Sequence, residues 1–197
     1  MSSHPPAGRR VALLTGERGS GKSTVCLRLR ELARGERLSV AGIVSVYRDA
    51  RRLELDAVDL SSLERWPLAS AAGPLEGPSV GRFSFSAQGI ARALDVLERA
   101  AALEAALLVV DEIGPLELTG HEGFYPFLER ARTADFPDLL LVVRPSLVDE
   151  LRALLRSEGA GRPPVFEATV DTREALPARL LESFGREAGD AGDARRV

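Results

Sequence analysis

The sequence is short of the residues that several classes of protein need. Its 197 residues include one cysteine, so no internal disulfide can form, which is typical of a reducing compartment. No apolar run approaches the ~18 residues of a membrane helix, and residues 1–10 lack the apolar core of a signal peptide. We therefore expect a cytoplasmic protein without a membrane partner.

Charge and size narrow the possibilities further. The formal net charge of −3 gives no global basic field, so we expect no nucleic-acid partner. With one cysteine and two histidines, no Cys/His cluster predicts a zinc site. The length suits one domain with a full hydrophobic core. We expect a flexible tail over residues 1–8, one domain over 9–185 and a second flexible tail over 186–197.

Lysine is almost absent, and the place of the single lysine is informative. Lys22 stands in the stretch Gly16–Thr24, which reads Gly-Glu-Arg-Gly-Ser-Gly-Lys-Ser-Thr and matches the G-x-x-x-x-G-K-[ST] pattern of a phosphate-binding loop. Apolar residues precede it at Val11–Leu14 and a helical pattern follows at Val25–Ala33, which is the context that the motif requires. A chance glycine-rich turn is the alternative, and this context argues against it.

Each residue type in this loop has a physical task. Glycines let the backbone wrap closely around phosphate, backbone N–H groups and the helix N-terminus face the negative charge, and the Lys22 ammonium contacts the β and γ oxygens. Ser23 supplies a hydroxyl ligand to Mg²⁺. Arg18 faces either the γ-phosphate or solvent. The loop residues expected to bind nucleotide are Gly16, Glu17, Arg18, Gly19, Ser20, Gly21, Lys22, Ser23 and Thr24.

Apolar strands alternate with helical patterns, which predicts an α/β fold with a mostly parallel sheet flanked by helices. The expected strands are residues 10–15, 39–47, 53–58, 80–85, 107–110, 139–143 and 165–168, and the expected helices are residues 25–34, 86–102, 123–133, 146–156 and 172–184. The second and third strands read as a hairpin inserted after the first helix. Residues 67–81 are rich in Pro, Gly, Ala and Ser and predict a long irregular connection.

Two carboxylates follow the apolar strand at 107–110. Asp111 stands at the C-terminal end of that strand, where ligands bind in open α/β sheets, and is the natural partner of Ser23 for Mg²⁺. Adjacent side chains of a strand point opposite ways, so we expect Glu112 to orient and deprotonate the attacking water. A solvated turn is the alternative for this pair. For Glu117 we expect a surface or capping role.

The chain contains no asparagine, and this absence excludes one kind of base pocket. The guanine-reading [NT]-K-x-D motif cannot occur, because the sole lysine follows Gly21. The sole glutamine, Gln88, is distant in sequence from both motifs, which favours Glu112 as the water-positioning group. The sequence indicates no base preference.

Taken together, five segments resemble the small P-loop nucleoside-triphosphatases, the family of the cancer-related nucleoside-triphosphatase and its archaeal and bacterial relatives. These segments are Gly16–Thr24, Ala41–Ile43, Val80–Phe83, Asp111–Leu118 and Thr169–Arg173, within a resemblance over about residues 10–182. It implies a RecA-like core and slow, Mg²⁺-dependent hydrolysis of ATP, GTP and other triphosphates. The family's loop residues map onto Gly16, Gly19, Gly21, Lys22, Ser23 and Thr24, and its acids onto Asp111 and Glu112.

The chain departs from this family at two places. It has Val46 and Tyr47 where the family often has acidic residues, and Thr172-Arg173 where the family often has Asn-Arg. The resemblance implies that Arg173 contacts the nucleotide, and the lost asparagine weakens that inference.

Charge that develops on the γ-phosphate usually needs an arginine. Arg82, Arg144 and Arg173 are candidates because each lies in or beside an expected strand end or family motif, and a surface ion pair is the alternative for each. We take Glu112, Lys22 and Arg82 as the expected catalytic residues. Two other functions stay open: a small-molecule phosphotransferase with residues 67–81 as a lid, and a nucleotide-gated module that acts through an unknown protein partner.

Overall fold

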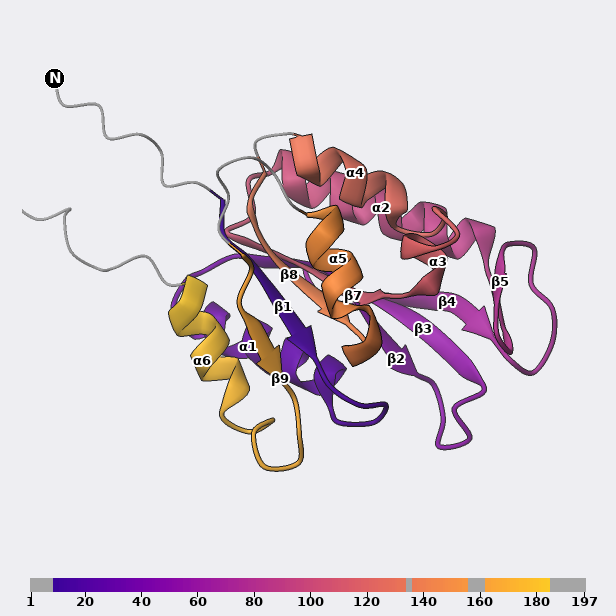
Figure 1. The fold of residues 1–197 in the computed structure, drawn as a ribbon, viewed down its shortest axis with the longest axis horizontal. Coiled ribbons are helices and arrows are strands. Elements are labelled where there is room, and N and C mark those ends of the chain that lie inside the picture. The colour runs from indigo at the N-terminus through magenta and orange to yellow at the C-terminus, as the bar shows by residue number, and fades with distance from the viewer. Residues whose placement is uncertain (1–8, 134–135, 156–161, 185–197) are drawn as a thin grey trace, which may run out of the picture.

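The computed structural model describes residues 9–133, 136–155 and 162–184 (Figure 1). The flexible tails expected at 1–8 and 186–197 lie outside the described residues. Within the described part, the α/β fold is confirmed: nine strands form one sheet, and helices cover both of its faces.

The sheet has a parallel half and an antiparallel extension. The strands are β1 (Val11–Thr15), β2 (Val40–Tyr47), β3 (Glu54–Asp59), β4 (Arg65–Ser70), β5 (Ser79–Val80), β6 (Phe83–Phe85), β7 (Leu107–Ile113), β8 (Asp138–Val143) and β9 (Val165–Glu167). Their spatial order is β5-β6-β4-β3-β2-β7-β8-β1-β9. Strands β2, β7, β8, β1 and β9 pair in parallel and form the parallel half. Strands β3, β4, β6 and β5 continue from β2 by antiparallel pairing and form the antiparallel extension.

The prediction of an irregular connection over residues 67–81 is wrong, because this segment contains most of β4 and all of β5. Pro67 lies opposite Asp56 beside a register shift in the β3–β4 pairing, and a proline is tolerated there because the ladder is already interrupted. The single strand expected over 80–85 is instead the β5–β6 hairpin, which turns at Gly81 with a φ of +56°. Of the expected hairpin, β2 belongs to the parallel half, and β3 begins a four-strand extension.

Helices pack against both faces of the sheet. They are α1 (Lys22–Gly35), α2 (Ala87–Ala102), α3 (Pro115–Leu118), α4 (Tyr125–Thr133), α5 (Val148–Leu154) and α6 (Leu176–Phe184), with a 3₁₀ turn, η1, at Pro145–Leu147. Apolar side chains of α1 and α6 fill the core on one face, and those of α2, α4 and α5 fill the core on the other. No helix within the described ranges is long and apolar enough to cross a membrane.

Helix boundaries mostly agree with the sequence, with two exceptions. The Ser86 side chain accepts a hydrogen bond from the Gly89 N–H at 3.0 Å, which confirms the expected cap of α2. The expected helix over 172–184 begins only at Leu176, because Thr169 and Thr172 hold the preceding residues in a hydrogen-bonded turn. The expected helix over 146–156 begins as η1 and its described α-helical part ends at Leu154.

One glycine sets the contact between β2 and β7. Gly42 has a φ of +119°, and a Cβ at this position would lie 2.0 Å from the carbonyl oxygen of Val109. Only glycine allows this close approach, because any side chain would collide with the backbone of β7. The pairing brings the C-terminal end of β2 beside the end of β7, where the two predicted carboxylates lie.

Candidate functional site

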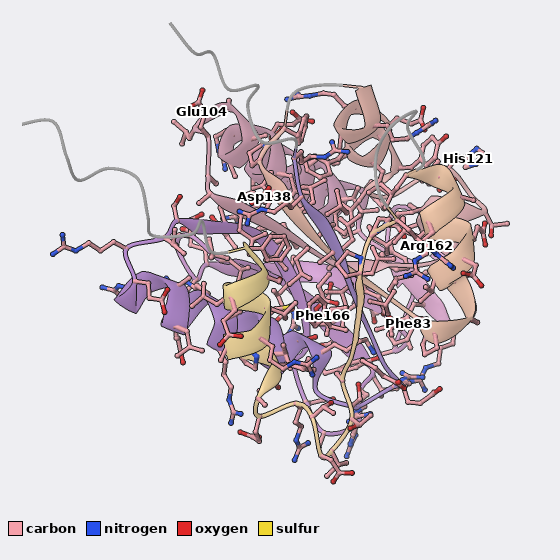
Figure 2. The ribbon with its side chains drawn as sticks, turned by 60° about the vertical axis from the view of Figure 1, so that its left-hand side comes forward. Phe83, Glu104, His121, Asp138, Arg162 and Phe166 are labelled. Carbon is pink, nitrogen blue, oxygen red and sulfur yellow. The ribbon has the colours of Figure 1, made fainter. Side chains whose placement is uncertain are left out.

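A cavity of about 670 Å³ opens where the C-terminal ends of β1, β2, β7 and β8 meet the start of α1. Its phosphate end is lined by the phosphate loop, Asp111, Glu112 and Arg144. Its other end, which we name the apolar end, lies under the antiparallel extension. The apolar end is lined by Leu55, Leu68, Val80, Phe83, Phe85, Leu116 and Phe124. Phe83 on β6 and Phe166 on β9, both labelled in Figure 2, lie near opposite edges of the sheet.

The phosphate loop has the backbone that its sequence predicts. Gly16, Gly19 and Gly21 have φ values of +146°, +85° and +98°, which favour glycine. A Cβ on Gly16 would lie 2.4 Å from the Ala168 carbonyl oxygen, so the loop packs directly on the segment after β9. The Lys22 ammonium donates to the carbonyl oxygens of Gly16 and Glu17, at 2.8 and 3.1 Å. The loop therefore curls around its own lysine at the start of α1.

Most of the predicted nucleotide-binding residues line this cavity, and two do not. Glu17, Arg18 and Thr24 join the glycines, Lys22 and Ser23 in the lining. Ser20 does not, and its hydroxyl is buried with no hydrogen-bond partner in the described part of the chain. Arg18 turns to the cavity wall, where it donates to the Tyr47 hydroxyl at 2.9 Å.

The other exception is Arg173, which packs beside the loop on the α6 side. Its Cδ would lie 3.3 Å from a Cβ on Gly21, and its Nε lies 3.7 Å from a Glu174 carboxylate oxygen. This position is next to the start of α1 but outside the lining of the cavity.

Ser23 and Asp111 meet directly. The Ser23 hydroxyl donates to Asp111 Oδ2 at 2.8 Å, although 88 residues separate them. Ser45 at the end of β2 holds the same aspartate twice, from its N–H to Oδ2 at 3.3 Å and from its hydroxyl to the Asp111 carbonyl oxygen at 2.6 Å. Asp111 is 2% exposed, and burial, followed by the charge of Glu112, raises the pKa of its carboxyl to about 7. A buried carboxylate oxygen beside a hydroxyl is a suitable pair of ligands for Mg²⁺.

No group of three or more His, Cys, Asp or Glu side chains in the described ranges forms an all-protein metal cage. Mg²⁺ does not need one, since it is commonly held by one or two carboxylates together with substrate phosphates and water. Ser23 and Asp111 therefore fit this ion.

Glu112 lies on the cavity wall next to Asp111 and pairs with Arg144 from the end of β8. Arg144 Nε and Nη2 donate to the two carboxylate oxygens of Glu112, at 3.1 and 3.5 Å. The β7–β8 register shifts between Val110 and Ile113, so this carboxylate comes from an irregular strand end. Of the three candidate arginines, Arg144 is the one that lines the cavity.

Arg82 lies away from the phosphate end. Its guanidinium stacks 5.1 Å from the Phe83 ring centre and donates through Nη2 to the Arg52 carbonyl oxygen at 3.0 Å. Arg82 does not line the cavity, whereas Lys22 and Glu112 do, so the three expected catalytic residues do not meet in one place. Arg82 instead links the β5–β6 hairpin to the turn between β2 and β3.

Glu117 is buried, so the surface role expected for it is wrong, whereas the capping role is confirmed. It is 3% exposed and accepts from the Gly114 N–H at 2.8 Å and the Phe124 N–H at 3.2 Å. Burial raises the pKa of its carboxyl to about 7, against the lowering by these N–H groups. Glu117 thereby ties the segment after β7 to the segment before α4.

Sequence reasoning missed three polar residues of the site: Ser45, Tyr47 and Arg52. Ser45 could have been noticed as the one polar side chain in the run Val40–Val46. Tyr47 follows two residues later, and its ring lies 5.7 Å from the Arg18 guanidinium and 5.5 Å from that of Arg52. Nothing in the composition of the turn over residues 48–53 distinguishes Arg52 from its arginine neighbours.

Comparison with known proteins bears on this arrangement. The sequence model of a family described as NTPase matches residues 11–181. The nucleoside-triphosphatase THEP1 of Methanothermobacter thermautotrophicus is 41% identical over 176 residues, covering 88% of this chain and 95% of that protein. The nucleoside-triphosphatase THEP1 of Methanopyrus kandleri is 35% identical over 178 residues, covering 86% and 92%.

Two solved structures share the fold. The crystal structure of THEP1 from Aquifex aeolicus has a TM-score of 0.69 at 20% identity and covers 89% of this chain and 99% of its own. The solution structure of a human cancer-related nucleoside triphosphatase has a TM-score of 0.66 at 25% identity, covering 88% and 96%. With a phosphate loop, an Asp-Glu pair and this sheet in place, the chain belongs to the nucleoside-triphosphatase family of hydrolases.

Proposed function

We propose that the protein hydrolyses nucleoside 5'-triphosphates, ATP and GTP among them, to the diphosphate and phosphate with Mg²⁺. The observation that carries the proposal is the 2.8 Å contact of Ser23 with Asp111 beside Glu112, at one wall of the cavity that the phosphate loop lines. When bound, Mg²⁺ supplies positive charge to the β and γ oxygens, and Ser23 and Asp111 would hold it.

The residues of the site then have separate tasks in binding and hydrolysis. The loop N–H groups, the N-terminus of α1 and the Lys22 ammonium bind the phosphates. A water oxygen bonds to the γ-phosphorus while the bond to the β,γ-bridging oxygen breaks, and the electron pair leaves with the diphosphate. Glu112 accepts the proton of this water, and Arg144 orients the Glu112 carboxylate through its two N–H contacts. Arg173 packs beside Gly21 outside the cavity lining, and its proposed role is a contact with the nucleotide.

The test is phosphate release from ATP, GTP, CTP and UTP, with Mg²⁺ and with EDTA. We expect metal-dependent release that Glu112→Gln lowers by about 10²–10⁴-fold, the usual worth of a general base, while triphosphate binding is kept. Glu104→Gln is the matched control, since Glu104 is exposed on the turn after α2 (Figure 2). Wild-type turnover in Glu112→Gln would remove the base role from this residue.

The apolar end of the cavity favours a second candidate, phosphoryl transfer to a small apolar alcohol. Hydrolysis needs only water beyond the γ-phosphate, whereas seven apolar side chains line this end. Comparing ADP formed with phosphate released, with and without benzyl alcohol, separates the two. Equal amounts under both conditions mean hydrolysis, and an excess of ADP in the presence of the alcohol means transfer.

A further inference from the structure

Four cationic side chains line the cavity: Lys22 of the phosphate loop, and Arg18, Arg52 and Arg144. Arg144 pairs with Glu112, and the Lys22 ammonium donates to carbonyl oxygens of its own loop. Neither Arg18 nor Arg52 forms an ion pair with a carboxylate within the described ranges. Both instead contact the Tyr47 ring. A guanidinium that is stacked on an aromatic ring and free of carboxylates is available to bind an anion.

The backbone of Arg52 is fixed by contacts on both sides. Its N–H donates to the carbonyl and to the side chain of Asp49, at 3.2 and 2.9 Å, which closes the turn between β2 and β3. Its carbonyl oxygen accepts the Arg82 guanidinium at 3.0 Å. The turn that carries Arg52 is therefore tied to the β5–β6 hairpin, while the Arg52 side chain remains exposed at the cavity.

The Arg52 guanidinium reaches over the phosphate loop itself. Its Nη1 and Nη2 atoms would lie 3.1 and 3.2 Å from a Cβ on Gly19. It thus covers the middle of the loop from the side of β2, whereas Arg173 packs on the loop at Gly21 from the side of α6.

The strand order of the sheet indicates which phosphate of a bound triphosphate would lie nearest Arg52. In a phosphate-loop site the metal ligands and the general base surround the β- and γ-phosphates, and here we assign these roles to Ser23, Asp111 and Glu112. Asp111 and Glu112 end β7, and β2 pairs directly with β7. The β2–β3 turn therefore starts on the side of the carboxylates, and its Arg52 reaches the loop at Gly19.

We propose that Arg52 contacts the terminal phosphate of a bound triphosphate and stabilises the charge that develops there during hydrolysis, with Tyr47 as its positioning residue. In this proposal Arg52, rather than Arg82, is the arginine that acts on the γ-phosphate. Its guanidinium donates N–H bonds and accepts none, so the water proton still passes to Glu112. The catalytic part of this proposal rests on the proposed hydrolysis, but the contact itself can be measured without turnover.

The binding experiment compares a non-hydrolysable triphosphate with a diphosphate. Wild type, Arg52→Ala and Arg51→Ala are titrated calorimetrically with Mg²⁺·AMP-PNP and with Mg²⁺·ADP. Arg51 is the matched control because it is an exposed arginine on the same turn that does not line the cavity. We expect Arg52→Ala to weaken AMP-PNP binding about tenfold, as for one lost charged hydrogen-bond pair, and to leave ADP binding within about twofold of wild type. Arg51→Ala should match wild type for both nucleotides.

Two results would overturn the proposal. If Arg52→Ala binds AMP-PNP as Arg51→Ala does, Arg52 makes no phosphate contact. If it loses AMP-PNP and ADP equally, the contact is to another part of the nucleotide. A wild-type protein that binds both nucleotides but releases no phosphate would contradict the proposed hydrolysis and leave this comparison intact.

Single-turnover hydrolysis tests the catalytic part. We expect a fall of about 10²–10³-fold in Arg52→Ala, at or below the low end of the effect of an arginine that contacts the transition state. Arg52→Lys should recover AMP-PNP affinity more than rate, because lysine keeps the charge but lacks the planar fork. Tyr47→Ala should lower the rate of hydrolysis, whereas Tyr47→Phe, which keeps the ring, should retain most of the wild-type rate. The double variant Tyr47→Ala/Arg52→Ala should be only slightly slower than Arg52→Ala alone. Full additivity of these two changes would show that Tyr47 does not act through Arg52.

Discussion

The parallel half of the sheet and the antiparallel extension contribute different things to one cavity. The parallel half supplies the groups that handle phosphate, namely the phosphate loop after β1, the carboxylates of β7 and Arg144 after β8. The extension supplies most of the apolar wall, and the turn from β2 into β3 supplies Arg52, which contacts Tyr47 at the end of β2. The difference shows that the two ends of one cavity are encoded differently, because the phosphate site has a short sequence signature and the apolar wall has none.

The largest effect that we expect comes from breaking the packing of the extension. Trp66 on β4 is 6% exposed, donates from its indole N–H to the Gly89 carbonyl at 3.0 Å and has the Arg92 guanidinium 4.3 Å from its ring centre. Trp66→Ala should lower the free energy of unfolding by about 3–5 kcal/mol, measured by urea denaturation. Leu103→Ala, at a side chain that is 82% exposed, is the control and should stay within about 0.5 kcal/mol of wild type. A similar small loss for Trp66→Ala would mean that the extension adds little to stability.

The next largest effect comes from the phosphate loop in the parallel half and is an effect on binding rather than on stability. Lys22→Ala should weaken Mg²⁺·AMP-PNP binding by about 1.5–3 kcal/mol, the worth of charged hydrogen bonds, with little change in unfolding free energy. Calorimetric titration measures the affinity, and Arg34→Ala, at an exposed position on the last turn of α1, serves as control. An unchanged affinity would contradict the assignment of the phosphate loop.

The last prediction concerns the segment between β7 and α4, which Glu117 holds. Burial raises the pKa of Glu117 to about 7 in the folded protein, above its ordinary value, so the folded state keeps its proton to higher pH than the unfolded state does. The stabilising contribution is complete below the unfolded pKa and is lost as pH rises to about 7. Glu117→Gln should therefore flatten the fall in stability between about pH 4.5 and 7, measured by urea denaturation in EDTA.

The comparison of Glu117→Gln with wild type isolates this residue, because any contribution of Asp111 is common to both. Glu122→Gln, at an exposed glutamate, should keep the wild-type slope. Identical slopes in wild type and Glu117→Gln would show that Glu117 is ionised in the folded protein throughout this range.

The sequence allowed the prediction of the parallel half, because its signals are local. A Gly-x-x-x-x-Gly-Lys-Ser run between a strand and a helix can be recognised within nine residues, and Asp111 could be placed because buried strands end at the same edge. The extension gave only part of such a signal, because strands were predicted over 53–58 and 80–85 but β4 was not. Pro67 lies within β4, and Gly81 separates β5 from β6, so residues 67–81 read as a loop. The pairing partners of these strands are set by tertiary contacts rather than by composition.

The positions of some single residues could not be predicted for the same reason. Glu117 was expected at the surface or in a cap, and its burial arises because residues 114–124 fold back over it. Arg82 and Arg52 are both arginines in turns of the extension, and the sequence alone does not tell which one reaches the phosphate loop. Only the pairing of β2 with β7 brings the Arg52 turn to the loop.

The two hydrogen bonds of Ser45 have a consequence for how the protein can change. Ser45 and Tyr47 are two residues apart on β2, so their side chains share a face and their spacing is set by the strand pitch, about 6.6 Å. The strand therefore fixes the distance between the Ser45 contact with Asp111 and the Tyr47 contact with Arg52. Substitution of either side chain would keep this distance, but inserting one residue between Ser45 and Tyr47 would turn the tyrosine to the opposite side of the sheet.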